Sequence, residues 1–278
     1  MNRQLGADAG VSAHGSPASA CFREALVTAA NAATKSVIGV DIGGTGIKGA
    51  TVDLDTGELT VKRIRLLTPE PSTPDAVAGV VAEVLDQVGA DGPVGLTLPS
   101  VITDGVVRTA ANIDPGWIGV NAVNLFGKAT GRAVGVVNDA DAAGIAEVRF
   151  GAGAGRGGVV IVVTLGTGIG SGLFVDGKLV ANTELGHLHL HHGDAEEFAS
   201  DAARERGDLS WEEYAARLQQ YLELLQRLFW PSLIIIGGGI SKKADKYLPH
   251  ITLDTAVVPA SLQNDAGIVG AAMFAPIG

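Results

Sequence analysis

The residues best suited to chemistry lie where strands rich in Val and Ile end in glycine. The first such run, 37–42, contains Asp41 near its end and is followed by a glycine turn and by Lys48. Glycine lets the backbone approach a ligand closely, and successive N–H groups in such a turn bind anions. A tight hairpin without a ligand is the alternative interpretation of this stretch alone. The predicted phosphate-binding residues are Asp41, Gly43, Gly44, Thr45 and Lys48, with Asp41 facing a metal ion through water.

Two further stretches repeat this pattern. The apolar run 161–165 leads into a second glycine turn, and the run 233–236 leads into a third. Three such junctions are hard to explain as chance turns, so together they favour a phosphate compound as ligand. The sequence lacks G-x-x-x-x-G-K-[ST], so a Walker-type NTPase is not expected. The second and third turns add Gly166, Thr167, Gly168, Gly237, Gly238 and Gly239 to the predicted phosphate or nucleotide site.

A carboxylate that could act as a base lies where the predicted strand 133–137 meets the predicted helix 140–149. Asn138 and Asp139 occupy this junction, and ligands of open α/β sheets bind beyond the carboxyl ends of strands. Asp is also a common first residue of a helix, so capping is the alternative role of Asp139. Asp141 could cap the helix instead and leave Asp139 available for chemistry.

Histidines alternate at His187, His189 and His191, with His192 beside them. On a strand, this alternation would place three imidazoles on one face, which by itself suggests a metal cluster.

The three glycine turns resemble those of sugar kinases of the ROK family (repressor, open reading frame, kinase), over roughly residues 36–275. Within this family the sequence is most similar to the polyphosphate glucokinase and polyphosphate/ATP-glucomannokinase group. The two stretches that carry this similarity are Thr-Leu-Gly-Thr-Gly-Ile-Gly-Ser-Gly at 164–172 and Gly-Gly-Gly-Ile-Ser-Lys at 237–242. The resemblance implies the actin/hexokinase-like ATPase fold, an α/β fold of two domains with a central cleft.

The resemblance also implies a reaction. In this family the Asn-Asp pair holds the sugar and the Asp is the base, so Asp139 is the expected catalytic base. The terminal phosphoryl group of inorganic polyphosphate or ATP would move to the 6-hydroxyl of glucose, and mannose is a further expected substrate. An ATP-only glucokinase is the alternative, and a non-catalytic sugar sensor or repressor is the third. The residues expected to bind the sugar are Ser100, Asn112, Asn138, Asp139, Glu184, His187 and Glu196, with Glu197 as the alternative to Glu196.

The expected cofactor is Mg²⁺, which Mn²⁺ could replace. Many ROK proteins use the His of an E-x-G-H element, here His187, as a zinc ligand together with a following cysteine cluster. The one cysteine of this sequence is Cys21, far upstream. No zinc is therefore expected.

Composition limits the partners and the compartment. A net charge of −10 argues against a nucleic-acid partner, and no apolar run approaches the ~18 residues of a membrane span. A single cysteine fits a cytoplasmic location. The expected state is a monomer or a homodimer. The 35 residues before Ser36 are small and polar, which predicts a mobile extension rather than the winged helix-turn-helix of a repressor.

Basic residues suggest a path for polyphosphate. Lys242, Lys243 and Lys246 follow the third turn. Together with Lys48, Arg149 and Arg156 they could guide a chain of phosphates past the adenosine position. For any single lysine, an ordinary solvated surface position is the simpler interpretation.

The pattern of elements predicts two similar domains. Each half begins with a glycine-turned β-meander and continues with β-α pairs, so the predicted domains are 36–138 and 139–278, with the last helix packing back on the first domain.

Thr73 is the expected N-cap of helix 74–88, and Ser210 and Glu213 form an expected capping box. The expected strands are 37–42, 47–53, 58–66, 94–98, 133–137, 158–164, 171–175, 178–181 and 233–236, with an edge hairpin at 101–109. The expected helices are 74–88, 121–130, 140–149, 194–206, 211–229, a short one from about 242 and a last one from 267.

Overall fold

The first half of the chain forms a five-stranded sheet in the order β3-β2-β1-β4-β7. The computed structural model describes residues 36–111, 113–191 and 193–277. β1 and β2 pair antiparallel across the first glycine turn, and β4 and β7 extend the sheet in parallel. The strands are β1 (Ser36–Gly43), β2 (Gly46–Asp53), β3 (Ile64–Leu66), β4 (Val94–Leu98) and β7 (Val134–Asn138).

The second half repeats this arrangement. Its sheet has the order β10-β9-β8-β13-β14, again an antiparallel meander followed by two parallel neighbours. The predicted internal repeat is therefore confirmed, with β14 as a strand that the sequence did not predict. The strands are β8 (Val159–Leu165), β9 (Ile169–Val175), β10 (Lys178–Val180), β13 (Leu233–Gly237) and β14 (Val257–Pro259). Two short hairpins pair β5 (Ile102–Thr103) with β6 (Val106–Val107), and β11 (His189–Leu190) with β12 (Gly193–Asp194).

Alternating side chains bury both faces of the first sheet. On β1, Ile38 and Val40 join the core formed with α2 (Pro74–Val88) and α3 (Ala122–Thr130). Val37 belongs instead to the core around α9 (Ala266–Met273), on the opposite face. This is the period of two that a strand buried on both faces requires.

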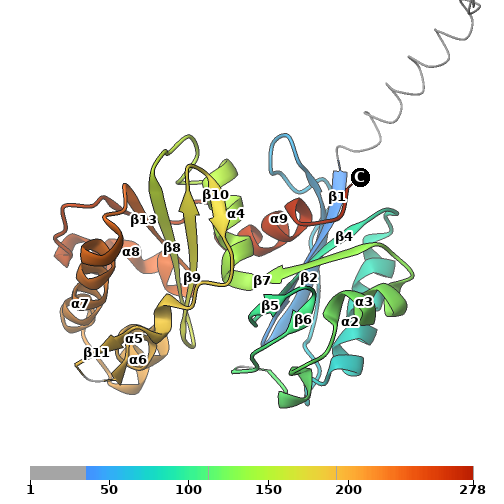
Figure 1. Cartoon of the computed structure of the whole chain (residues 1–278), viewed down its shortest axis with the longest axis horizontal. Coiled ribbons are helices and arrows are strands. Elements are labelled where there is room, and N and C mark those ends of the chain that lie inside the picture. The colour runs from blue at the N-terminus through green and yellow to red at the C-terminus, as the bar shows by residue number, and fades with distance from the viewer. Residues whose placement is uncertain (1–35, 112, 192, 278) are drawn as a thin grey trace, which may run out of the picture. The chain divides into compact units, whose positions relative to one another are not determined.

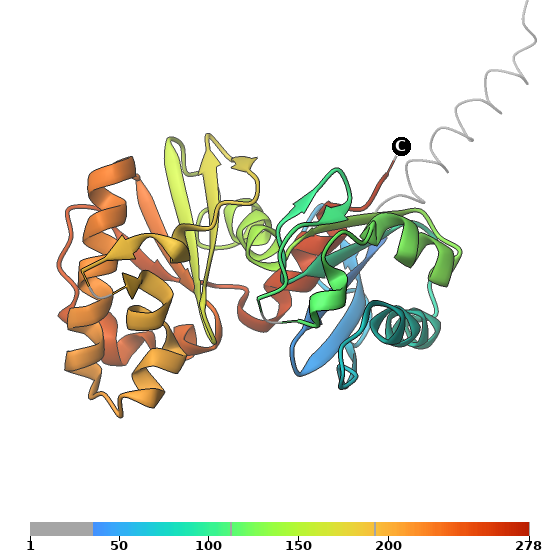
Figure 2. The ribbon, with the colours of Figure 1, turned by 60° about the horizontal axis from the view of Figure 1, so that its bottom comes forward.

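The second sheet is covered in the same way. Ile161 and Val163 of β8 join the core with α7 (Trp211–Phe229), whereas Val160 and Val162 pack with α4 (Asp139–Phe150). α4 and α9 pack against each other. Both views of the ribbon show these two helices between the two sheets (Figures 1 and 2). The limits of the two domains, 36–138 and 139–278, stay a prediction.

α9 lies in a groove that three glycines make on the first sheet. Gly39, Gly95 and Gly135 are register partners on β1, β4 and β7. A Cβ atom on any of them would overlap a backbone carbonyl group of α9 or of the residue that follows it: Ile268, Ala271 or Phe274. The helix backbone therefore rests directly on the sheet, which only glycine permits.

A buried carboxylate ties the end of α4 to the segment that leads into α9. Glu147 is almost fully buried. Its Oε1 accepts the N–H of Leu262 at 2.7 Å, and its Oε2 accepts the N–H groups of Ala152 at 2.9 Å and Ser261 at 3.1 Å. These bonds hold the two helices that lie between the sheets.

The predicted strand 58–66 is wrong in its middle. Leu59 makes an isolated bridge to Val52, whereas β3 pairs with β2 in the register Gly49↔Ile64. Between these contacts β2 advances three residues, from 49 to 52, and its partner five, from 59 to 64. The two extra residues form a bulge that interrupts the ladder.

The predicted helix 194–206 is also wrong, because it is broken at Ser200. Ser200 has extended backbone angles, and its Oγ accepts the N–H of Ala203 at 3.1 Å. A serine that bonds its own backbone competes with helix continuation and starts a new helix. The two pieces are α5 (Ala195–Ala199) and α6 (Asp201–Arg206).

The other helix ends agree with the sequence in part. The capping box of Ser210 and Glu213 at the start of α7 is confirmed. Thr73 occupies the N-cap position of α2, but its side chain makes no capping hydrogen bond. The short helix expected from about 242 begins earlier, as a 3₁₀ turn at Gly239–Lys243 that continues into α8 (Ala244–Tyr247). In the part of the chain that the structure describes, no helix is long and apolar enough to cross a membrane.

Candidate functional site

Asp139 lies at the carboxyl end of β7, where α4 begins. The cap of α4 is Asn138, not Asp141. Its Oδ1 accepts the N–H groups of Ala140 at 2.9 Å and Asp141 at 3.1 Å, while its amide donates to the carbonyl of Ser100 at 3.2 Å. Asp139 is therefore not needed as the cap and remains available for chemistry, as predicted. The residue that replaces it as the cap is Asn138 rather than the predicted Asp141.

Asp141 has a structural role instead. It is buried, and its Oδ2 accepts the N–H of Asn182 at 2.8 Å. Burial raises the pKa of Asp141 to about 6, and the Asn182 hydrogen bond opposes this.

The environment of Asp139 makes its carboxylate a stronger base than an ordinary aspartate. Its burial among protein atoms raises its pKa to about 6, and the nearby carboxylate of Asp41 adds to the rise. The N–H of Ala140, 2.9 Å from Oδ1, acts in the opposite direction. A pKa near the pH of the cell suits a general base.

Asp41 belongs to a small polar network on the α9 face of β1. Its Oδ2 pairs with the Lys48 ammonium group at 3.0 Å, since the two residues are register partners on β1 and β2. Its Oδ1 accepts from Thr97 Oγ1 at 3.0 Å, and that oxygen accepts the N–H of Ile42 at 2.9 Å. A Cβ atom on Gly267 would come within 2.7 Å of Oδ1. Lys48 is thus a paired cation, and Thr97 is a partner that the sequence did not reveal.

The first turn joins two antiparallel strands. Gly44, Gly46 and Gly49 happen to fit the spacing G-x-G-x-x-G. That spacing indicates dinucleotide binding only between a strand and a helix, a context that β1 and β2 do not provide.

The second and third turns lie against each other. Gly238 has φ 80°, in the region that favours glycine, and a Cβ atom there would overlap the Leu165 backbone at the end of β8. The carbonyl of Gly166 accepts the N–H of Ala202 in α6 at 3.1 Å. The glycines of both turns therefore share one edge of the second sheet, as parallel β8 and β13 require.

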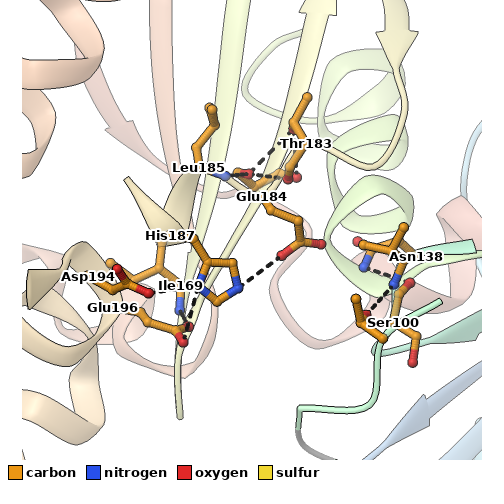
Figure 3. A network of polar contacts seen from close by, with 12 residues as sticks. Ser100, Asn138, Ile169, Thr183, Glu184, Leu185, His187, Asp194 and Glu196 are labelled. Carbon is orange, nitrogen blue, oxygen red and sulfur yellow. Dashed lines mark hydrogen bonds and ion pairs between the residues drawn. The ribbon is translucent and has the colours of Figure 1, made fainter. Parts of the chain in front are cut away.

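His187 gathers three carboxylates around one imidazole. Its Nε2 lies 3.7 Å from Glu184 Oε2, and its Nδ1 lies 3.3 Å from Asp194 Oδ2 and 3.7 Å from Glu196 Oε1. Figure 3 shows Glu184 between His187 on one side and the Asn138–Ser100 pair on the other. Glu184 is close enough to Asp139 to contribute to its raised pKa. The predicted residues Glu184, His187 and Glu196 are thus brought together.

The pKa values of two carboxylates in this group, Glu184 and Asp194, shift in opposite directions. Burial raises the pKa of Glu184, and His187 and Glu196 act on it more weakly. Hydrogen bonds from His189 and His187 lower the pKa of Asp194. Asp194 was not predicted, because no motif marks a lone Asp at the start of a short helix.

Glu196 also touches the second turn. Its Oε2 accepts the N–H of Ile169 at 3.3 Å, and a Cβ atom on Gly168 would overlap this oxygen. Its neighbour Glu197 is exposed and lies near Gly193. The carboxylate of Glu196, rather than that of Glu197, therefore links the His187 group to the predicted phosphate turn.

The alternating histidines do not share one strand. His187 lies in a 3₁₀ turn, and only His189 and Leu190 form the strand β11. Among the described residues, no group of three or more His, Cys, Asp or Glu side chains could hold a metal ion. His192 lies outside the described residues.

Two further predicted sugar ligands are Ser100 and Asn112. Ser100 is buried, and in the described part of the chain its Oγ has no hydrogen-bond partner. An unpartnered buried hydroxyl is costly unless a ligand satisfies it. Asn112 lies outside the described residues.

Arg149 and Arg156 lie away from these groups. They line a cavity of about 550 Å³ together with Asp176, Leu179 and other residues. Arg149 is ten residues along α4 from Asp139, about 15 Å at the rise of an α-helix. This separation speaks against both arginines as part of a path for the phosphoryl donor.

Comparison with known proteins identifies the family. Residues 37–205 match the ROK family. This chain belongs to the ROK family. A relative from Mycobacterium tuberculosis (strain ATCC 25618 / H37Rv), named polyphosphate glucokinase, is 52% identical over 236 residues, which are 84% of this chain and 89% of the relative.

Solved structures of ROK proteins have the same fold. The inorganic polyphosphate/ATP-glucomannokinase of Arthrobacter sp. strain KM is 53% identical, with a TM-score of 0.83 over 86% of this chain and 98% of its own. A ROK family glucokinase from Streptomyces griseus, solved with glucose and AMPPNP, is 28% identical, with a TM-score of 0.74 over 87% of this chain and 100% of its own. The expected actin/hexokinase-like fold is therefore confirmed.

Proposed function

We propose that this ROK protein is a glucokinase that transfers the terminal phosphoryl group of inorganic polyphosphate, and of ATP, to the 6-hydroxyl of glucose. The relative from M. tuberculosis is named polyphosphate glucokinase, and the Arthrobacter protein is an inorganic polyphosphate/ATP-glucomannokinase. The observation that carries the proposal is the position of Asp139 at the carboxyl end of β7, as a half-buried carboxylate close to the carboxylates of Asp41 and Glu184. Mannose is included as a second sugar because the Arthrobacter protein is a glucomannokinase.

In this proposal Asp139 accepts the proton of the 6-hydroxyl. The oxygen then attacks the terminal phosphorus, the bond to the bridging oxygen breaks, and the shortened donor leaves with the electron pair. Negative charge stays on the phosphoryl oxygens, so N–H groups of the first and second turns and Lys48 stabilise it. These turns comprise Gly43, Gly44 and Thr45, and Gly166, Thr167 and Gly168.

The third turn would hold the adenosine of ATP. Gly237, Gly238 and Gly239 end β13 beside the second turn, and their backbone has no side chain to exclude a ligand. This proximity supports one donor site for both phosphates and nucleoside.

Sugar binding in this proposal uses the groups described above. Ser100 Oγ, buried and unpartnered among the described residues, is suited to a sugar hydroxyl. The remaining proposed ligands are Asn112, Asn138, Asp139, Glu184, His187 and Glu196. Alternating acceptors and donors of this kind suit a polyol.

A divalent metal accompanies phosphoryl donors in kinases, and we propose Mg²⁺, with Mn²⁺ able to replace it. Carboxylate oxygens and water are the ligands that Mg²⁺ prefers. Asp41 fits this role through water, because its carboxylate is held in place by Lys48 and Thr97. The metal would neutralise charge on the donor. Zinc is no part of the proposal, and the cytoplasmic location and the monomeric or dimeric state remain predictions.

The donor proposal predicts competition. If polyphosphate and ATP share the site formed by the three turns, each should inhibit competitively when the other is the varied donor. The measurement is the initial rate of glucose 6-phosphate formation with Mg²⁺, at several fixed levels of the second donor. Noncompetitive inhibition would exclude a shared site. If ATP supports turnover and polyphosphate does not, the protein is an ATP-only glucokinase and the proposal is wrong.

A further inference from the structure

Three cations gather around the indole of Trp211, the first residue of α7. Arg204 Cζ lies 4.7 Å from the ring centroid, Lys243 Nζ 5.7 Å and Lys246 Nζ 5.5 Å. We call these four residues the Trp211 cluster. Tyr247 stacks on the same indole with its ring centroid at 6.1 Å and an interplanar angle of 23°. The aromatic ring thus holds cations from three separate elements close together.

The free charge of the Trp211 cluster resides on its two lysines. Arg204 is paired with Asp201 at 2.9 Å and with Glu205 at 3.1 Å. Within the described part of the chain, no ion pair is recorded for Lys243 or Lys246. Both lysines are exposed. Two exposed ammonium groups held over one ring make a local positive patch in a protein of net charge −10, and such a patch attracts an anion.

Two segments connect the second phosphate turn to the Trp211 cluster. The Gly166 carbonyl accepts the N–H of Ala202, two residues before Arg204 in α6. Gly238 packs on the backbone of Leu165. The 3₁₀ turn Gly239–Lys243 follows, and at the rise of a 3₁₀-helix Lys243 lies about 10 Å along the chain from Gly238. In Figure 1, α6, α7 and α8 lie on one side of the second sheet, away from α4. The Trp211 cluster therefore lies one short step beyond the turn at which the transferred phosphoryl group would bind.

We propose that the Trp211 cluster binds the part of an inorganic polyphosphate chain that extends beyond the phosphoryl group to be transferred. This inference rests on the proposed function, and it specifies where the rest of the donor lies. A polyphosphate carries negative charge along its whole length, so it can satisfy both lysines at once. The charge of ATP ends at its α-phosphate. The cluster is then a specificity site for the polymer rather than for the nucleotide.

The test compares two double variants of equal charge. Lys243→Ala/Lys246→Ala removes the two lysines of the cluster. Lys62→Ala/Lys128→Ala removes two exposed lysines of the first half and serves as the matched control. For each full-length protein, the measured quantities are KM and kcat with long-chain polyphosphate, KM with ATP, and the inhibition constant of tripolyphosphate. The polyphosphate series is repeated at several salt concentrations.

The expected result is a rise of about tenfold in KM for long-chain polyphosphate in the cluster variant, with kcat unchanged and the ATP and tripolyphosphate values within about twofold. The slope of log KM against log salt should fall by roughly one for each lysine removed, which a merely structural role would not produce. A wild-type KM in the cluster variant, or an equal rise for ATP, would overturn the inference while leaving the proposed function intact. Absence of polyphosphate turnover in the wild type would instead overturn the proposed function, and the inference with it.

Discussion

Replacing Asp139 by Asn is expected to lower kcat by about 10²-fold or more with either donor, the usual contribution of a general base. Asn keeps the shape of the side chain, and the cap of α4 is made by Asn138, so the helix should be unaffected. The affinity for glucose should change much less than kcat, because the amide can still bond a sugar hydroxyl. The measurement is kcat from initial rates, together with the glucose dissociation constant from calorimetry.

The pH profile gives this prediction a second readout. In the wild type, kcat/KM should fall as the pH decreases through about 6, because protonated Asp139 can no longer accept the proton. Asp141→Asn is the matched control, since the pKa of Asp141 is also raised to about 6 while its carboxylate bonds the Asn182 N–H. That variant should keep its acid limb and most of its kcat. A near-normal kcat in Asp139→Asn would remove Asp139 from the role of base.

The largest expected effect on folding is that of Gly95→Ala. A Cβ atom at this position would overlap the carbonyl group of Ala271, so α9 would have to move off the first sheet. We expect the free energy of unfolding to fall by about 3 kcal/mol or more, the upper range for overpacked cores, since backbone rather than a flexible side chain must yield. Urea unfolding followed by circular dichroism measures this change.

Gly79→Ala is the control for that experiment. Gly79 lies within α2, and apart from its chain neighbours and the backbone of its own helix no heavy atom lies within 4 Å of a Cβ atom placed there. Alanine should therefore stabilise the protein by about 0.5–1 kcal/mol, because glycine is unfavourable in a helix interior. Equal stabilities of the two variants would contradict the described contact between α9 and the glycine row.

Hydrophobic periodicity and the residues that start or end helices predicted those parts of the fold that depend on local sequence. α2 has the predicted bounds because Pro74 starts it and Gly89, with φ 67°, ends it. α7 begins at the predicted capping box. The row of Gly39, Gly95 and Gly135 could not be predicted, since each glycine is unremarkable in its own strand. Its meaning arises only from the register of three strands and the helix laid across them.

The residues of the candidate site could be predicted from the sequence only in part. The place of Asp139 at a strand end marked it as a candidate, but its role as the base came from the family resemblance, as did the roles of Glu184, His187 and Glu196. Thr97 and Asp194 have no signal in the sequence, because their role comes from neighbours 56 and 7 residues away, Asp41 and His187. The break at Ser200 was missed because a serine within a helical pattern does not reveal which backbone N–H its hydroxyl will bond.

The most direct test of the proposed function is phosphoryl transfer in the complete absence of nucleotide. Purified full-length protein is incubated with glucose, Mg²⁺ and long-chain polyphosphate, and ³¹P NMR follows the appearance of glucose 6-phosphate. The Asp139→Asn variant is measured in parallel under the same conditions. The predicted result is glucose 6-phosphate from the wild type and a rate about 10²-fold lower, or none, from the variant. No glucose 6-phosphate from the wild type, in a preparation that is active with ATP, would contradict the proposal.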